Sequence, residues 1–431
     1  MLLIYTHKIT KRFTYTMRQM FGEILGIEHS FATKVEDFIK HSGPKITYTK
    51  QPLQNEFFIR SNDLLFEQGI NDIAIKIQEW DELPCFFGAG EQSVIPFDIF
   101  SASFYLLSRY EEYLPHVKDE VGRFPAKSSF LYKESILHRP LVDLWAFKFL
   151  GLLKERFPEL VSKQRKFQFQ SIINVTTSHC YAHRGVFRNI GGLAIDASRF
   201  KFSSIVKRIA TWVNPEKDPY NNYAELLELH QKFKVKSYFF FQFAAYSRHD
   251  KNVSIFKNKF RHLIKSIADY SKVGLSASYQ SAYDSEVLKK EKEQLSNLIK
   301  RPVNSVRLRY NKVNVPDSYR KLITLEITDD YSMGYTHQIG FRAGTCTSHF
   351  FYDINLEMQQ PLKVHPFVLF DYSLVNYKQQ QQVFDKLDDI YREVKKLNGT
   401  FTIVFSNELF GKKHRLNWLD LYQKLLRRYY V

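Results

Sequence analysis

The chain has 431 residues, 62 of them basic and 45 acidic, and carries a formal net charge of +17. Hydrophobic residues make up 44% and charged residues 25%, the balance of an ordinary globular protein. No run of about 18 apolar residues is present, so no membrane-spanning helix is expected, and three cysteines are too few for a disulfide framework.

The basic residues are dispersed along the chain, so the charge favours an anionic partner: an acidic glycan, an anionic lipid surface or a nucleic acid. No zinc-finger spacing or RNA-recognition motif supports nucleic-acid binding, and none is expected. The apolar run at Met1–Tyr5 is too short for a signal peptide. We therefore expect a cytoplasmic protein, with peripheral contact to the inner membrane as the alternative.

The first part of the chain reads as a mixed α/β domain over residues 1–168. Strand-like runs at Lys45–Thr49, Glu56–Arg60 and Ile73–Ile77 precede helical patterns at Ser101–Tyr113 and Leu141–Glu155. The charged segment 153–168, which holds Pro158, then predicts a helix end and a linker.

In residues 169–431, short apolar strands alternate with helices. The expected strands are Phe169–Thr176, Lys236–Phe243, Val273–Ser278, Ser305–Tyr310, Val364–Phe370 and Phe401–Ser406. The expected helices are Ala224–Phe233, Val253–Tyr270, Glu286–Ile299, Gln379–Leu397 and Asn417–Arg428. Apolar strands with helical crossovers indicate a parallel sheet buried on both faces, and about seven such units favour a barrel. Function in such barrels lies at the carboxyl ends of the strands.

Several strings carry a family resemblance, and the most specific is Gly-Phe-Arg-Ala-Gly-Thr at 340–345. The other strings are Met1–Thr10, Ile95–Tyr113, Arg188–Gly192, Asp330–Tyr335 and His365–Phe367. With them the chain resembles the polysaccharide deacetylases (carbohydrate esterase family four), and more narrowly the Bacteroidetes-type deacetylase-like proteins with their own N-terminal domain. The resemblance implies an α/β fold: a distorted (β/α) barrel preceded by a mixed α/β domain.

The resemblance also implies a chemistry. In that family one Asp and two His hold a divalent metal, a second Asp acts as base on the metal-bound water, and a late His acts as acid. At the matching positions this chain carries hydroxyls and one amide. These positions are Thr176 for the base, Ser178, Ser276 and Gln280 for the metal ligands, and Ser406 for the acid. Neutral hydroxyls are poor ligands for divalent metals, so we expect neither a metal nor an acid–base pair.

Five other residues are candidates for a ligand groove near the mouth of the barrel: Arg342, Tyr279, Tyr310, Tyr335 and Asp330. The tyrosines could stack on sugar rings, or they could simply pack in the core. Arg342 is either a ligand contact or a buried structural arginine. For Asp330, as for Asp329 and Asp371, a capping or turn role is the alternative.

A rebuilt metal site is the main competing interpretation. His179, Cys180 and His183 follow the first strand of the second domain, and imidazole and thiolate ligands suit zinc. In the family the positions of Cys180 and His183 hold an Ala and a Tyr. This favours random sequence drift at these positions over the formation of a new metal site.

The sequence thus favours a catalytically inactive deacetylase-like protein that binds an anionic glycan or a protein of glycan assembly. Two alternatives remain. One is an active N- or O-deacetylase with an unconventional zinc or other divalent-metal site, and the other is a scaffold at the membrane surface that works through its positive charge.

Overall fold

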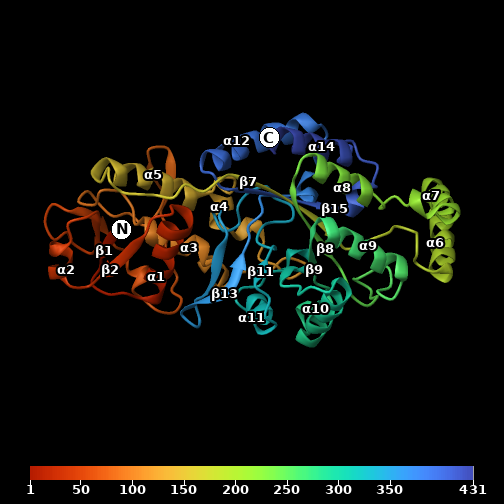
Figure 1. The fold of residues 1–431 in the computed structure, drawn as a ribbon, viewed down its shortest axis with the longest axis horizontal. Coiled ribbons are helices and arrows are strands. Elements are labelled where there is room, and N and C mark those ends of the chain that lie inside the picture. Colours follow the sequence, from red (N-terminus) through yellow and green to blue (C-terminus); the bar gives the residue numbers. More distant parts are fainter. Residues whose placement is uncertain (431) are drawn as a thin grey trace.

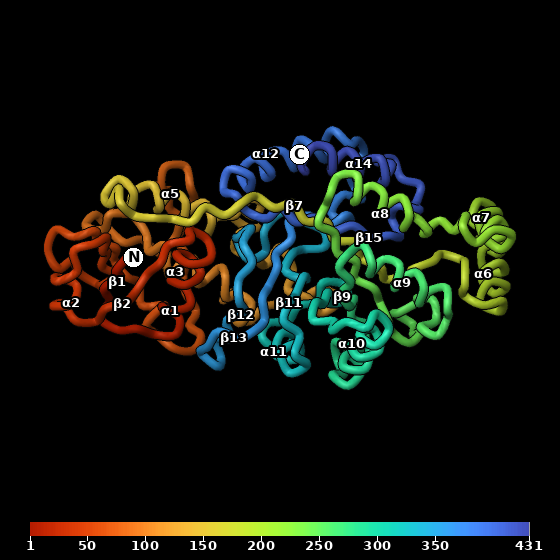
Figure 2. Tube along the Cα trace, viewed as in Figure 1, coloured from red at the N-terminus to blue at the C-terminus, as the bar shows by residue number. Residues whose placement is uncertain are grey.

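The computed structural model describes residues 1–430, which are organised by two largely parallel sheets (Figure 1). A four-stranded sheet lies at one end of the elongated molecule, and a nine-stranded sheet lies in the middle. Helices α6 (Val186–Ser198) and α7 (Phe202–Val213) lie at the opposite end. Figure 2 follows the chain from α5 (Leu141–Arg156) along the molecule into β7 (Gln168–Val175).

The four-stranded sheet is parallel throughout and has the order β2-β1-β3-β4. Its strands are β1 (Leu2–Tyr5), β2 (His29–Ala32), β3 (Lys45–Thr49) and β4 (Phe57–Arg60). The strand expected at Ile73–Ile77 is wrong: this segment is irregular. The alternating apolar residues suggested a strand, and Ile73 and Ile75 do pack against the N-terminal core. The backbone of this segment, however, pairs with no strand. A short antiparallel pair, β5 (Gln78–Trp80) and β6 (Leu83–Cys85), follows.

Around this sheet lie α1 (Lys11–Met17), the π-helix η1 (Arg18–Ile24), α2 (Val35–Lys40), α3 (Ile99–Leu107), α4 (Phe130–Lys133) and α5. Asp98 caps α3, because its Oδ1 accepts hydrogen bonds from the backbone N–H groups of Phe100 and Ser101, each at 3.0 Å. The helix expected at Ser101–Tyr113 stops earlier, at Leu107. Arg109 takes a left-handed conformation, with φ of 55°, and begins a separate turn, η3 (Tyr110–Glu112).

The nine-stranded sheet has the order β12-β13-β11-β10-β9-β8-β7-β15-β14 and is parallel except at β12. After β7 its strands are β8 (Lys236–Phe241), β9 (Lys272–Ser276), β10 (Ser305–Arg307), β11 (Asp329–Asp330), β12 (His349–Asp353), β13 (Met358–Val364), β14 (Leu369–Phe370) and β15 (Thr400–Ser406). Within residues 1–430 the outermost strands, β12 and β14, do not pair with each other, so the expected barrel is not confirmed. The mixed α/β class with parallel sheets is confirmed.

The helices of this second part are α6, α7, α8 (Tyr223–Lys232), α9 (Asn258–Tyr270), α10 (Ser285–Ile299), α11 (Asp317–Thr324), α12 (Gln380–Lys396), α13 (Asn407–Phe410) and α14 (Trp418–Tyr429). Among residues 1–430, none of the helices is both long and apolar enough to cross a bilayer. The expected helices agree with α8, α10, α12 and α14 to within one residue at each end, but the one expected at Val253–Tyr270 begins five residues later, as α9. Sequence analysis missed the α6–α7 pair and the antiparallel β12–β13 hairpin.

A buried cluster of charges joins the two parts of the chain. Arg342 binds Glu112 through both oxygens of the carboxylate: Nε lies 2.8 Å from Oε1, and Nη2 lies 2.6 Å from Oε2. Arg109 Nε donates to the same Oε1 at 2.8 Å, and its guanidinium also donates to the carbonyl oxygen of Arg342. Burial raises the pKa of Glu112, but the charges of Arg342 and Arg109 outweigh that effect and lower the pKa below its usual value. Arg109 also pairs with Glu111 at 2.6 Å, so two arginines are balanced by two carboxylates in this cluster.

The Gly-Phe-Arg-Ala-Gly-Thr string is the loop that delivers Arg342 to this cluster. Gly340 has φ of 138°, and a Cβ there would lie 2.4 Å from the carbonyl oxygen of Leu137, so only glycine fits. At the other end of the string, Thr345 Oγ1 donates to Asp143 Oδ2 at 2.6 Å. The most specific string of the chain is thus a joint between its two parts.

The β12–β13 hairpin forms a second joint, because Tyr352 and Ile354 belong to the hydrophobic core of the N-terminal part. At its tip Glu357 pairs with Arg12 of α1, and Arg12 Nε donates to Glu357 Oε2 at 2.9 Å. Residues about 340 positions apart in the sequence therefore share one core.

We predict that Glu112→Ala lowers the free energy of unfolding by about 3–5 kcal/mol, because it leaves Arg342 as a buried charge without its partner. Urea denaturation followed by tryptophan fluorescence measures this. Arg392→Ala is the control: it removes an exposed pair with Asp389 and is expected to change stability by less than about 0.5 kcal/mol. Equal effects of the two substitutions would show that the buried cluster does not hold the parts together.

Candidate functional site

A cavity of about 300 Å³ opens where β7, β10, β14 and β15 end. Its lining comes from these strand ends, from the turn η7 (Arg309–Asn311), and from two loops that reach over them. The lining residues are Val121, Arg123, Asn174, Thr176, Leu308, Arg309, Tyr310, Asn311, Thr336, His337, Phe370, Tyr372, Ser406 and Glu408. Carboxyl ends of parallel strands are where α/β proteins place their ligands, so this cavity is the candidate site.

The two hydroxyls predicted at this mouth, Thr176 and Ser406, do lie together in the cavity, and each has an acidic partner. Thr176 Oγ1 donates a hydrogen bond to Glu408. The backbone N–H of Ser406 donates to Asp371 Oδ2 at 2.5 Å, and its Oγ lies 3.4 Å from Oδ1. The hydroxyls are thus engaged within the protein and not arranged as an acid and a base.

Asp371 is fully buried behind Ser406, at the start of the turn η8 (Asp371–Leu374). Burial raises the pKa of Asp371 to about 7, although backbone N–H groups of Ser406 and Tyr372 oppose the rise. The charge of Glu408 adds to it. Asp371 therefore keeps its proton at pH values where an exposed Asp would release it.

Two polar groups in the cavity wall have unused hydrogen-bonding capacity. Asn174 Oδ1 is buried and has no partner among the described residues. Arg309 Nη2 donates to the carbonyl oxygen of His249 at 3.2 Å, but its buried Nε has no hydrogen-bond acceptor and lies 3.8 Å from Asp250 Oδ1. A buried acceptor and a buried donor without partners are costly unless a ligand or water satisfies them.

Aromatic rings form the apolar side of the same mouth. Tyr310 is 37% exposed, and the guanidinium of Arg309 lies 4.6 Å from its ring centroid. Tyr279 meets Tyr310 edge to face at 6.2 Å and stacks on His249 at 4.2 Å. Of the three tyrosines proposed for a groove, Tyr310 lines this cavity and Tyr279 flanks it.

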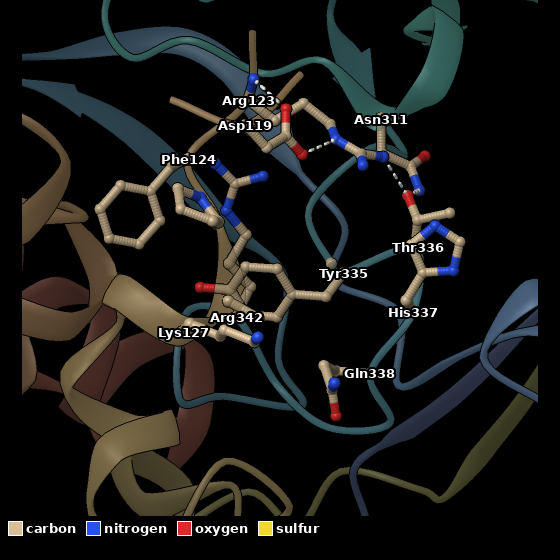
Figure 3. A pocket seen from close by; sticks show the side chains of 13 residues that line it. Asp119, Arg123, Phe124, Lys127, Asn311, Tyr335, Thr336, His337, Gln338 and Arg342 are labelled. Atoms are coloured by element: carbon tan, nitrogen blue, oxygen red, sulfur yellow. Dashed lines mark hydrogen bonds and ion pairs between the residues drawn. The ribbon is translucent and has the colours of Figure 1, made fainter. Parts of the chain in front are cut away.

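A second cavity of about 190 Å³ adjoins the first and shares Arg123, Asn311, Thr336 and His337 with it (Figure 3). Arg123 connects the two: its Nε lies 2.7 Å from Asp119 Oδ2, and its Nη1 donates to Thr336 Oγ1 at 2.8 Å. Tyr335 and Arg342 line this second cavity. The Arg342 guanidinium is occupied by Glu112, as the structural alternative expected.

Asp330 lies in neither cavity. It is fully buried, and its Oδ2 accepts hydrogen bonds from Tyr319 Oη at 2.9 Å and from the backbone N–H of Ser332 at 3.0 Å. These contacts fix the backbone after β11.

The remaining positions matched to metal ligands hold neutral side chains. Ser178 Oγ donates to Asn252 Oδ1 at 3.0 Å, Ser276 is buried at the end of β9, and Gln280 is exposed on the next turn. Hydroxyls and an amide are weak donors for divalent cations, and here one of the hydroxyls is already bonded within the protein. These residues do not fit the family's metal.

The His179, Cys180 and His183 cluster is a tight loop. The two imidazole rings meet edge to face at 5.0 Å, and burial lowers the pKa of His179 to about 4. The backbone N–H groups of residues 180–182 all donate to the carboxylate of Asp218 at 2.8 Å. Across residues 1–430 no group of three or more His, Cys, Asp or Glu side chains is placed to hold a metal ion.

Sequence reasoning missed Asn174, Glu408, Arg309 and Arg123. An amide between the apolar residues Ile173 and Val175 was a usable signal for Asn174, and Glu408 lies two residues beyond a recognised strand end. Arg123 gave no signal, because it reaches the mouth from the N-terminal part.

A family of unknown function, DUF7033, matches residues 2–158. Among curated proteins none matches the chain. Solved structures give distant likenesses. One is a putative polysaccharide deacetylase from Mycobacterium smegmatis, with 12% identity and a TM-score of 0.37 over 62% of this chain and 87% of that one. Another is the polysaccharide deacetylase Bc1974 from Bacillus cereus, with 10% identity and a TM-score of 0.31 over 61% and 86%. A third is a mutant of BA3943, described as a CE4 family pseudoenzyme with restored enzymatic activity, with 9% identity and a TM-score of 0.28 over 60% and 63%.

We predict that Asp371 makes stability fall as pH rises from 3.8, its ordinary pKa, to about 7. In this window the folded carboxyl keeps its proton while the unfolded chain releases it. The free energy of unfolding of the wild type, minus that of Asp371→Asn, should therefore fall by up to roughly 1.4 kcal/mol per pH unit and level off above the window. Urea titrations across the pH range measure it.

Glu291→Gln is the matched control, because burial raises the pKa of Glu291 to about 7 as well. It should remove a separate part of the pH dependence and leave the part due to Asp371 in place. Identical pH profiles for the wild type and Asp371→Asn would contradict the assignment.

Proposed function

We propose that this chain binds a carbohydrate in the cavity at the strand ends and does not carry out metal-dependent deacetylation. The observation that carries the proposal is the buried, unpaired Asn174 Oδ1 in the wall of that cavity. A buried acceptor is stabilised by an O–H donor, and sugar hydroxyls are donors of that kind.

The neighbouring groups suit the same ligand. Arg309 lines the same cavity, and its Nε has no hydrogen-bond acceptor although it lies 3.8 Å from Asp250 Oδ1. A sugar hydroxyl can therefore donate to Asn174 while another oxygen of the sugar accepts from the Arg309 guanidinium. The rings of Tyr310 and Tyr372 give an apolar surface for the C–H face of a pyranose. A volume of about 300 Å³ is at the small end of ligand sites and matches one sugar residue of a longer chain.

Charge favours an acidic glycan over a neutral one. Arg123 and Arg309 both line the mouth, and a carboxylate on the sugar would accept from guanidinium groups in a charge-assisted bond. The net charge of +17 would attract such a polymer at long range. An acidic polysaccharide of the cell envelope, or a protein that assembles one, is the partner that this reading implies.

The side chains at the strand ends support the proposal that the chain does not deacetylate. Thr176 and Ser406 are bonded to Glu408 and Asp371, and neither is a base at neutral pH. The alternative, an active deacetylase with an unconventional site, makes a different prediction in the experiment below.

We predict that uronic-acid-containing oligosaccharides bind the wild type and that Asn174→Leu weakens binding by about tenfold, the effect of losing one buried hydrogen bond. Arg309→Ala should weaken the binding of acidic oligosaccharides more than the binding of neutral ones. Calorimetric titration measures both, with the exposed Arg392→Ala as the control. Release of acetate from N- or O-acetylated sugars in the presence of Zn²⁺ or Co²⁺ would overturn the proposal, as would unchanged affinity in both cavity variants.

A further inference from the structure

The helical pair α6 and α7 lies at the end of the molecule opposite the N-terminal sheet (Figures 1 and 2). Its buried residues are polar, and many of its apolar residues are exposed. The one buried residue of each helix is polar: Asn189 in α6 and Thr211 in α7. Large apolar residues instead face outward, with exposed fractions from 44% at Trp212 to 94% at Phe187. The others include Phe200, Phe202, Val206 and Val213. An exposed apolar surface of this kind marks an interaction site.

A polar contact holds the pair together without using these apolar side chains. Arg208 of α7 reaches across α6, where its Nη2 lies 2.7 Å from Asp196 Oδ2 and its Nη1 lies 3.2 Å from Asn189 Oδ1. Gly192 gives it room, because a Cβ there would lie 2.4 Å from Nη1. Since these contacts of Arg208 are polar and lie between the two helices, the exposed apolar residues remain free to contact another molecule.

Basic residues surround the apolar ones. Residues 186–213 contain five basic side chains and a single acidic one, Asp196, which is used by Arg208. Arg199 and Lys201 are exposed in the turn between the helices, next to Phe200 and Phe202. Farther along the chain, at the start of α9, exposed Lys257 and Lys259 follow the exposed Phe256.

We propose that α6 and α7 form a docking surface that inserts into the headgroup region of an anionic lipid bilayer. Apolar and aromatic side chains with Lys and Arg beside them are the composition of helices that lie in a membrane interface. With 13 and 12 residues the helices are too short to cross a bilayer, so they lie in its surface.

A second copy of the chain is a poorer fit as the occupant. A symmetric contact through this surface would bring the basic residues of one copy against those of the other, and like charges across an interface are unfavourable. Anionic headgroups complement the same charges, and each Lys or Arg near such a surface contributes about 1 kcal/mol in the direction of binding, equivalent to about fivefold in affinity. The surface also projects from the end of the molecule, which suits contact with a flat bilayer (Figure 1).

The test is flotation of the full chain with vesicles of phosphatidylglycerol in phosphatidylcholine, compared with phosphatidylcholine alone. The wild type should bind the anionic vesicles preferentially. Replacing Phe187, Phe200 and Phe202 together by Ser should weaken binding by about tenfold or more for each side chain. The double variant Arg199→Ser, Lys201→Ser should weaken vesicle binding by about tenfold or more. Raising the salt concentration from about 0.1 M to about 1 M should also weaken the binding of the wild type.

The matched control replaces three apolar residues that are equally exposed elsewhere, Ile39, Val117 and Val161, by Ser. It should bind vesicles as the wild type does, and thermal unfolding of both triple variants should match the wild type. No binding to anionic vesicles, or equal binding to neutral ones, would overturn the proposal. So would a dimer in sedimentation equilibrium that the Phe variant abolishes, which would identify a second copy as the occupant.

Discussion

Glu112 lies between two arginines, and none of the three side chains is more than 2% exposed. A charge in such surroundings costs several kcal/mol unless its partners are in place, so each member of the cluster requires the others. Arg109 and Glu112 come from the N-terminal part, and Arg342 comes from a loop of the second part. Val313, whose carbonyl oxygen also accepts from Arg342, lies just beyond the turn that lines the cavity. The shape of the candidate site therefore depends on an ion cluster whose members do not line the cavity of about 300 Å³.

The strand ends illustrate how hydroxyl groups can occupy the mouth of an α/β sheet at little cost. A buried carboxylate needs a cation or several donors, whereas a hydroxyl needs one acceptor at most. Thr176, Ser178 and Ser406 each have such a partner inside the protein. Asp371 keeps a carboxyl behind Ser406, with its proton held near neutrality by burial.

How much of this could be read from the sequence depends on which side chains face inward. The strand β3 matches its expected range in full and β15 to within one residue, because their apolar runs are buried as the pattern assumes. The α6–α7 pair escaped notice for the opposite reason: its apolar residues face outward, against the assumption behind periodicity. Thr176 and Ser406 line one cavity, since both lie where neighbouring parallel strands end. Arg123 could not be predicted from the sequence, because its position at the cavity is set by the packing of the N-terminal part over the strand ends.

The sharing of Tyr335, Tyr352 and Ile354 with the N-terminal core has an evolutionary consequence. Modules that recombine freely between genes carry a complete core with them. Residues 2–158, the stretch matched by DUF7033, do not contain all of the residues of their hydrophobic core. Transferred to another gene without a hairpin equivalent to β12–β13, this stretch would expose an aromatic-lined gap. Its inheritance should therefore be tied to that hairpin, and the two segments should vary together among relatives even though nearly 200 residues separate them.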